Sequence, residues 1–249
     1  MIGRAYIGTS GWSYTSWEKA FYPERLPKTR HFEFYATQFP TVEINLTFYR
    51  LPTLKMVERW RDQTPAGFLF AIKGSRFITH MKKLLNPKDA LQEFFRCLRP
   101  LQRRIGIVLW QLPPFLGKDL PRLESFLKQL PKSYDYAVEF RHPSWLSTDV
   151  FALLRRHRIA HVSVSSRGMP MDLTVTSEVV YVRFHGLDAG AAHDYTVPEL
   201  EPWAEHVRRQ IKLCKRAFVY FNNDVHARAP ANARTFMQMI DHAEHPSAP

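Results

Sequence analysis

The segment Tyr134–Trp145 reads YDYAVEFRHPSW and joins a short β-prone run to a cluster of charged side chains. We expect a strand over Tyr136–Arg141, ended at Pro143, because proline has no N–H to donate to a sheet. A carboxylate, a guanidinium and an imidazole then stand together in Glu139–His142, at the C-terminal end of that strand. Charged side chains seldom finish a buried strand unless they are paired or functional. This segment therefore predicts one wall of a binding site.

Similar β-prone runs recur roughly every 25 to 35 residues and alternate with stretches of helical periodicity. The expected strands are Ala5–Gly8, Thr41–Asn45, Phe68–Gly74, Ile105–Leu112, Tyr136–Arg141, His161–Ser165, Val179–His185 and Ala217–Asn223. This alternation favours the α/β class and a TIM-like (β/α)8 barrel formed as a single domain over residues 1–249, with an open doubly wound sheet as the alternative. Arg167–Glu178 is too short and too mixed for a helix, so we expect the sixth crossover to be a loop. The tail 242–249 is expected to be frayed.

Two short stretches of the sequence are typical of the first residues of a helix. Asn86 before Pro87 is typical of an N-cap followed by proline in the first helical position. Ser147 before Thr148 is a second candidate N-cap.

Composition limits the location of the protein. No apolar run approaches the roughly 20 residues that a membrane-spanning helix needs. The first residues, MIGRAYIGTS, lack the apolar core of a secretion signal. Cys97 and Cys214 both fall in helical patterns, which is typical of reduced thiols in a cytoplasmic protein. We expect no membrane partner and no cofactor, because no cofactor-binding motif is present. A metal held by His80, His185, Glu139 and Asp224 is an alternative that no ligand spacing supports.

The formal net charge of +12 raises the possibility of a nucleic-acid partner. The basic runs weaken that interpretation, because Arg103–Arg104, Arg155–Arg158 and Lys215–Arg216 stand at expected helix ends or just before strands. Cations there offset the negative end of the helix dipole. We therefore expect these runs at the N-terminal face of the barrel, away from the site.

Polar residues alternate with apolar ones where the expected strands end. Glu43 and Asn45 share one face of their strand, while Val42 and Ile44 share the other. The same spacing gives the pairs Ala71 with Lys73, Leu109 with Gln111, Glu139 with Arg141, Ser163 with Ser165 and Arg183 with His185. In a barrel whose apolar sets face the helices, these pairs point inward near the C-terminal strand ends, where such barrels carry their active sites. A structural ion pair such as Glu139 with Arg183 is the alternative.

The residue types at these ends suggest roles. The candidate acid or base groups are Glu43, Glu139, His142 and His185. The candidate substrate-binding residues are Trp12, Tyr14, Asn45, Tyr49, Lys73, Arg76, His80, Gln111, Arg141, Arg183, Asn222 and Asn223. The cations among them suit a phosphate or carboxylate, the amides suit hydrogen bonding, and the rings suit stacking on a base or sugar.

These strand-end motifs resemble those of the YecE-like family. The matching stretches are GTSGWSY at Gly8–Tyr14, TVEINLTFYRLP at Thr41–Pro52, FAIKGSRFITH at Phe70–His80, QLPP at Gln111–Pro114, EFRHPSW at Glu139–Trp145, RFHG at Arg183–Gly186 and YFNND at Tyr220–Asp224. The resemblance implies a TIM-barrel-like fold and no particular reaction, since the family is catalogued as a domain of unknown function. Leu46 and Ala227 depart from it, because serine and glycine are usual at those positions.

The first functional hypothesis is an enzyme that hydrolyses a small anionic substrate, phosphorylated or sugar-containing, at the barrel mouth. The second is a nucleic-acid-associated protein or nuclease that uses the basic surface and the aromatic residues of the mouth. The third is a barrel that binds a metabolite without turning it over. The sequence leaves the oligomeric state open.

Overall fold

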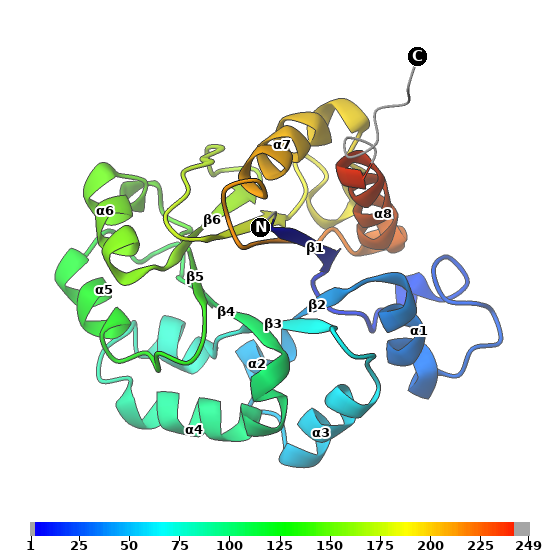
Figure 1. Ribbon diagram of the computed structural model, residues 1–249, viewed down its shortest axis with the longest axis horizontal. Coiled ribbons are helices and arrows are strands. Elements are labelled where there is room, and N and C mark those ends of the chain that lie inside the picture. Colours follow the sequence, from blue (N-terminus) through cyan, green and yellow to red (C-terminus); the bar gives the residue numbers. More distant parts are fainter. Residues whose placement is uncertain (1–2, 242–249) are drawn as a thin grey trace.

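The computed structural model describes residues 3–241 and has an eight-stranded parallel sheet at its centre (Figure 1). The strands are β1 (Arg4–Thr9), β2 (Thr41–Ile44), β3 (Leu69–Lys73), β4 (Ile105–Gln111), β5 (Tyr136–Glu139), β6 (Ala160–Ser165), β7 (Val179–Phe184) and β8 (Arg216–Phe221). Their order around the sheet is β1-β8-β7-β6-β5-β4-β3-β2. All eight expected strands are present, although most end one or two residues before the expected point.

The two outer strands of this order meet and nearly close the sheet into a barrel. A parallel bridge joins Ser10 to Glu43, and the Gly11 N–H donates to the Glu43 carbonyl at 2.8 Å. The Tyr35 hydroxyl links the same strands, accepting from the Thr9 N–H at 2.9 Å and donating to the Thr41 carbonyl at 3.0 Å. The (β/α)8 prediction is therefore confirmed, and the open doubly wound sheet is wrong.

Helices surround the strands (Figure 1). They are α1 (His31–Gln38), α2 (Leu46–Tyr49), α3 (Leu54–Asp62), α4 (Lys88–Leu98), α5 (Leu120–Leu127), α6 (Thr148–His157), α7 (Val197–Gln210) and α8 (Arg228–Asp241). Residues 166–178, all of which the structure describes, contain no helix, so the sixth crossover is a loop as expected. None of the helices within residues 3–241 has both the length and the apolar character needed to cross a bilayer.

The strand register separates an outer core from the barrel interior. Val42, Ile44 and Val138 belong to the apolar layer under the helices, as the alternation predicts. The interior is filled by a second cluster that consists of Ala71, Ile107, Leu109, Ala137, Ala160, Val162, Val164, Val179, Tyr181, Phe218 and Tyr220. The strand-end polar side chains lie above this packed floor.

Strand β6 reverses the expected alternation. Val162 pairs with Tyr181 and lies in the interior cluster, so Ser163 and Ser165 face the helices. The Ser165 hydroxyl hydrogen-bonds the Tyr195 hydroxyl at 2.9 Å, which satisfies both groups in the outer layer. The prediction that these serines line the mouth is wrong, because the polar residues of β6 find their partners on the helix side.

The two expected helix caps differ from prediction in detail. Helix α4 begins at Lys88 with Pro87 as its N-cap, and Asn86 has a left-handed backbone (φ +45°) one residue further out. Ser147 is the N-cap of α6, as expected, but its hydroxyl contacts Asp149 at 2.6 Å rather than a backbone N–H. The sequence patterns therefore predicted the starts of α4 and α6 to within one residue.

The basic runs lie at the N-terminal ends of strands, as predicted. Arg104 directly precedes β4, and its guanidinium donates to the carbonyls of Arg61 (2.7 Å) and Thr64 (2.9 Å), just after α3. Arg156 forms an ion pair with Glu124 at 3.0 Å. These cations contact groups of the protein itself at the N-terminal face of the barrel. The opposite face, formed by the C-terminal strand ends, is the mouth.

Candidate functional site

Arg183, near the C-terminal end of β7, is the centre of a buried charge network at the mouth. Its side chain is fully buried, and its two terminal nitrogens contact two carboxylates. Nη2 lies 2.6 Å from Glu43 on β2, and Nη1 lies 2.5 Å from Glu139 on β5. One guanidinium therefore joins strands from opposite parts of the barrel, because all three residues face the interior at one level.

Glu43 is held on every side. Besides Arg183, its carboxylate accepts hydrogen bonds from the Ser10 hydroxyl at 2.7 Å and the Tyr181 hydroxyl at 2.6 Å. Burial alone would raise the pKa of this carboxyl, but the charges of Arg183 and Lys73 outweigh burial and lower the pKa. Glu43 is thus an ionised structural group with its oxygens occupied.

Glu139 is also ionised and buried. Burial would raise its pKa, but Arg141 and Arg183 outweigh burial and hold that pKa well below its usual value. The Arg141 side chain bends back along its own strand so that Nε donates to Glu139. Arg183 and Arg141 are therefore the two nearest cations, as the strand geometry allows.

His185 extends this network toward solvent. Its Nε2 lies 2.7 Å from an Arg141 terminal nitrogen, and its Nδ1 lies 3.2 Å from the Asn222 amide. Because arginine only donates, Nε2 accepts the hydrogen bond from Arg141. Burial and the charge of Arg183 lower the pKa of His185 to about 4, so the imidazole is neutral at pH 7.

Lys73, the last residue of β3, differs from the other charged residues of the mouth. Its side chain is 8% exposed and faces the interior next to Leu109. The amine lies 4.4 Å from the centre of the Phe48 ring. Burial and the charge of Arg183 lower the pKa of Lys73 to about 8. Among residues 3–241, no carboxylate oxygen lies within 4.0 Å of this amine.

An aromatic lip, made of Phe48, Tyr49, His80 and Phe115, follows strands β2, β3 and β4. The Phe48 ring is 5.0 Å from both Tyr49 and His80, and His80 is 6.5 Å from Phe115. Burial and the charges of Lys73 and Arg76 lower the pKa of His80. The exposed Arg76 guanidinium is therefore close enough to His80 to act on it electrostatically. Two of the predicted stacking and binding residues, Tyr49 and His80, therefore lie beside Lys73.

Other predicted binding residues have mixed positions. Gln111 pairs with Glu139 across the sheet and faces the mouth. The Asn45 amide oxygen is buried without a hydrogen-bond partner among the described residues. Tyr14 donates to the Ser10 carbonyl at 2.5 Å, and its pKa is raised by burial and by Asp224 and Glu43. Trp12 stacks on Phe32 of α1 at 4.1 Å and packs in the outer layer, so its ring is not part of the network.

Two predicted site residues lie apart. The His142 ring contacts the Ser144 hydroxyl at 2.8 Å and caps the short turn Pro143–Trp145. Asn223 is buried on the outer side of β8, where its amide donates to the His193 carbonyl and to Asn232 at 2.7 Å. The expectation that they join the others is wrong, because each follows an inward-facing residue and so points the opposite way.

The structure adds residues that sequence reasoning missed. Tyr181 shares the inward face of β7 with Arg183, so the period-two rule could have found it. Ser10 is brought in by the β1–β2 closure, which no local pattern signals. Asp224, after β8, has a carboxyl whose pKa is raised by burial, and its charge acts on Tyr14. Among the carboxyls of Glu43, Glu139 and Asp224, it is the one whose pKa is raised rather than lowered.

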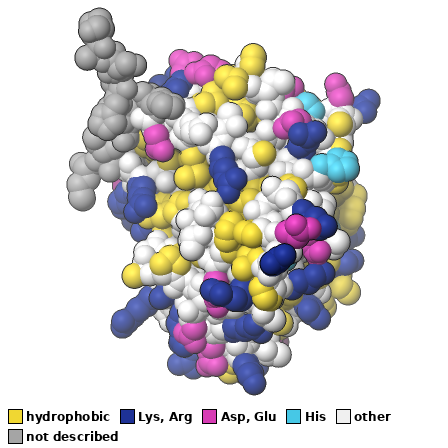
Figure 2. Space-filling view, turned by 90° about the vertical axis from the view of Figure 1, so that its right-hand side faces the viewer, with side chains coloured by type: hydrophobic (Ala, Val, Ile, Leu, Met, Phe, Trp, Pro, Cys, Tyr) yellow, Lys and Arg dark blue, Asp and Glu magenta, His cyan; other side chains and the backbone are white. Residues whose placement is uncertain are grey.

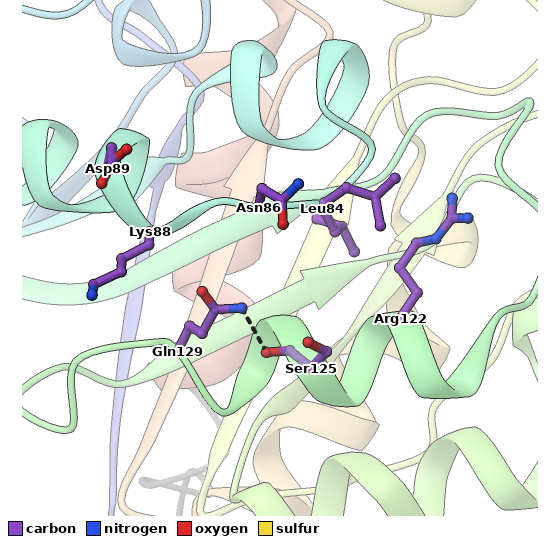
Figure 3. A pocket seen from close by; sticks show the side chains of 8 residues that line it. Leu84, Asn86, Lys88, Asp89, Arg122, Ser125 and Gln129 are labelled. Atoms are coloured by element: carbon purple, nitrogen blue, oxygen red, sulfur yellow. Dashed lines mark hydrogen bonds between the residues drawn. The ribbon is translucent and has the colours of Figure 1, made fainter.

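A separate cavity of about 390 Å³ lies outside the barrel, between the start of α4 and α5 (Figure 3). It is lined by Leu84, Leu85, Asn86, Lys88, Asp89, Arg122, Ser125 and Gln129. The Gln129 side-chain amide donates a hydrogen bond to the Ser125 carbonyl at 3.0 Å. None of the sequence-predicted site residues lines this cavity. Within residues 3–241, no three His, Cys, Asp or Glu side chains are grouped so as to hold a metal ion.

The buried network at the mouth carries an excess of positive charge. Lys73, Arg141 and Arg183 supply three positive charges, and the ionised Glu43 and Glu139 supply two negative ones. Outside this network, Arg76 adds a cation and Asp224 a carboxyl. His185 is neutral at pH 7. Within the network one positive charge is therefore left uncompensated, and Lys73 is the cation with no carboxylate within 4.0 Å among residues 3–241. Such a site attracts an anion.

Comparisons with known proteins agree with the motifs and the fold. The family model described as "Protein of unknown function DUF72" matches residues 6–249. The chain is 40% identical to the UPF0759 protein YecE of Escherichia coli (strain K12) over 143 residues, which are 57% of this chain and 50% of that protein. The alignment thus spans half the length of that relative. The UPF0759 protein YunF of Bacillus subtilis (strain 168) is 26% identical over 95% of this chain and 94% of its own length.

Solved structures share the barrel. A DUF72 family protein from Thermotoga maritima MSB8 has a TM-score of 0.87 and 30% identity, over 96% of this chain and 99% of that chain. A DUF72 family protein from Enterococcus faecalis V583 shares the fold at 20% identity, with a TM-score of 0.80 over 96% of this chain and 98% of its own. The expected resemblance is confirmed: this chain belongs to the DUF72 family of proteins of unknown function.

Proposed function

We propose that the protein is a cytoplasmic enzyme that binds a small anionic substrate at the barrel mouth and carries out acid–base chemistry on it. The observation that carries the proposal is the buried Lys73 amine, which has no carboxylate within 4.0 Å among the described residues. A buried ammonium normally has a paired anion, so an anionic ligand is the missing partner. The cytoplasmic location rests on the two buried, unpaired cysteines, Cys97 and Cys214.

The geometry favours other residues for proton transfer than the two glutamates that the sequence suggested. Glu43 and Glu139 have lowered pKa values and occupied oxygens, so neither suits proton donation at pH 7. We assign them to positioning Arg183 and Arg141. Proton transfer then falls to Asp224, whose pKa is raised, and to His185, which is neutral and partly exposed. Hydrolysis of a phosphorylated or sugar-containing substrate stays a prediction.

Calorimetric titration with inorganic phosphate tests the binding half. Wild-type protein is expected to bind phosphate, and Lys73→Met should weaken binding about 10- to 100-fold, the usual cost of losing one charged hydrogen bond. Lys215→Met is the matched control, because Lys215 is an exposed lysine paired with Glu178 at the N-terminal face. Equal binding by wild type and Lys73→Met would contradict the proposal.

A second candidate, binding of single-stranded nucleic acid, is favoured by exposed rings beside cations near the mouth. Tyr49, Phe77 and Phe115 are 68%, 45% and 63% exposed. Lys82 lies 5.5 Å from the Phe77 ring, and Lys83 lies 5.5 Å from the Phe115 ring. Rings that stack bases next to cations that contact phosphates are typical of such proteins.

The wider surface gives less support to this candidate. On the face drawn in Figure 2, Lys and Arg side chains lie among Asp and Glu side chains rather than forming one uninterrupted basic area. Fluorescence anisotropy with a labelled single-stranded oligonucleotide tests the candidate. Combining Tyr49→Ala with Phe115→Ala should weaken binding strongly and Arg155→Gln with Arg156→Gln only slightly, and affinity should fall steeply with salt. The reverse order of effects would place the nucleic acid at the N-terminal face.

A further inference from the structure

We propose that Lys73 is an amine nucleophile, which forms a Schiff base with the carbonyl group of an anionic carbonyl compound such as a 2-oxo acid. The anionic part of this inference rests on the proposed function. The amine part rests on the surroundings of Lys73 alone.

Lys73 is fixed where a nucleophile is useful. It is the last residue of β3, at the C-terminal end of the barrel, and its carbonyl accepts a hydrogen bond from the Thr47 hydroxyl at 2.6 Å. Its side chain crosses the Phe48 ring at 4.4 Å. The strand and the ring therefore hold the amine in one place, above the packed interior of the barrel.

The two nearby glutamates do not neutralise this amine by direct contact. Glu43 binds Arg183, Ser10 and Tyr181, and Glu139 binds Arg183 and Arg141. The arginines thus take the carboxylate oxygens that an ordinary buried lysine would use. A desolvated amine next to other cations is the environment in which enzymes activate lysine as a nucleophile.

The protonation state agrees with this geometry. The pKa of Lys73 is lowered to about 8, first by burial and then by the charge of Arg183. At pH 8 roughly half of the Lys73 amines are neutral, compared with below about 1% for a lysine of unperturbed pKa near 10.4. Lys73 therefore presents a free lone pair far more often than a surface lysine does.

The chemical step balances without an added oxidant or reductant. The neutral amine nitrogen attacks the carbonyl carbon and forms a C–N bond, and the carbonyl π pair moves to oxygen, which takes up a proton. The resulting carbinolamine loses its hydroxyl group with a second proton as water, leaving a protonated imine. The net reaction is ammonium plus carbonyl giving iminium plus water. The carboxylate of a 2-oxo acid can meet Arg141, whose side chain is 22% exposed.

Reductive trapping tests the inference on the wild-type protein. The protein is incubated with pyruvate and sodium cyanoborohydride, digested, and mapped by mass spectrometry. We expect one preferred adduct, on Lys73, formed with a pH midpoint near 8. Lys82 and Lys83, nearby in sequence, serve as internal controls. Lys73→Arg keeps the charge and should abolish the preferred adduct.

The outcomes separate this inference from the proposed function. Labelling of Lys73 no faster than that of Lys82 and Lys83 would overturn the nucleophile, even if phosphate binding still depends on Lys73. Preferred labelling of Lys73 by pyruvate but not by neutral acetone, with protection by inorganic phosphate, would support both. Equal labelling by acetone, without phosphate protection, would support the nucleophile and overturn its anionic substrate. Mapping of wild-type protein keeps the test valid even if Lys73→Arg does not fold.

Discussion

Arg183 shows how one buried side chain can be costly and still be retained. Desolvating a guanidinium and two carboxylates costs several kcal/mol per ion, and only good geometry offsets that cost. Here the terminal nitrogens of Arg183 reach Glu43 at 2.6 Å and Glu139 at 2.5 Å, while Tyr181 satisfies a remaining carboxylate oxygen. The network therefore fixes three strands relative to one another and leaves Lys73 without a carboxylate within 4.0 Å in the described part of the chain.

Replacing Glu139 tests whether its role is structural. Glu139→Gln should lower the free energy of unfolding by roughly 3–5 kcal/mol, because Arg183 and Arg141 lose a shared buried anion. Denaturant midpoints measure the change. Glu199→Gln, on the exposed first turn of α7, is the control and should cost about 1 kcal/mol or less. A Glu139→Gln protein as stable as wild type would rule out the structural role.

Lys73 should leave a signature in the pH dependence of stability. Its pKa is about 8 in the folded protein, below the unfolded value near 10.4. Between these values the unfolded chain binds a proton that the folded protein has released, so stability rises with pH by up to roughly 3 kcal/mol. Unfolding free energies of wild type minus Lys73→Met, measured from pH 7 to 10, should show this rise. A flat difference would mean that the amine has an ordinary pKa.

The turn before α8 contains Ala227, one of the two residues that depart from the pattern of the resembling family. His226 and Ala227 both have left-handed backbones, each with φ +56°. The sequence resemblance leads us to expect glycine at position 227, and glycine adopts this conformation without the steric penalty that a Cβ adds. Ala227 therefore keeps a strained turn, which is buried beside the mouth.

Relieving that strain should stabilise the protein. Ala227→Gly is expected to raise the free energy of unfolding by about 0.5–1 kcal/mol. The matched control is Ala233→Gly inside α8, where the same change should lower it by about 1 kcal/mol. Thermal unfolding measures both. If the two changes act in the same direction, strain at Ala227 is not the reason.

The barrel itself could be predicted from sequence, because strand runs and helical stripes repeat along the whole chain. The inward faces of β2, β5 and β7 also followed from period two, which placed Glu43, Glu139 and Arg183 together. Period two failed on β6, because it cannot say which face finds polar partners: Ser165 bonds Tyr195 on the helix side. The period-two rule also could not show that Arg183 would form ion pairs with both Glu43 and Glu139, because those contacts depend on distances across the barrel.

A crystal structure grown with saturating inorganic phosphate would locate the anion. The uncompensated positive charge of the buried network belongs to Lys73, whereas the N-terminal cations Arg104, Arg156 and Lys215 already have protein partners. We predict phosphate within hydrogen-bonding distance of the Lys73 amine, about 2.7–2.9 Å, with Arg141 as a second contact. Phosphate bound at the N-terminal face or in the cavity beside α4, with none at Lys73, would contradict the account.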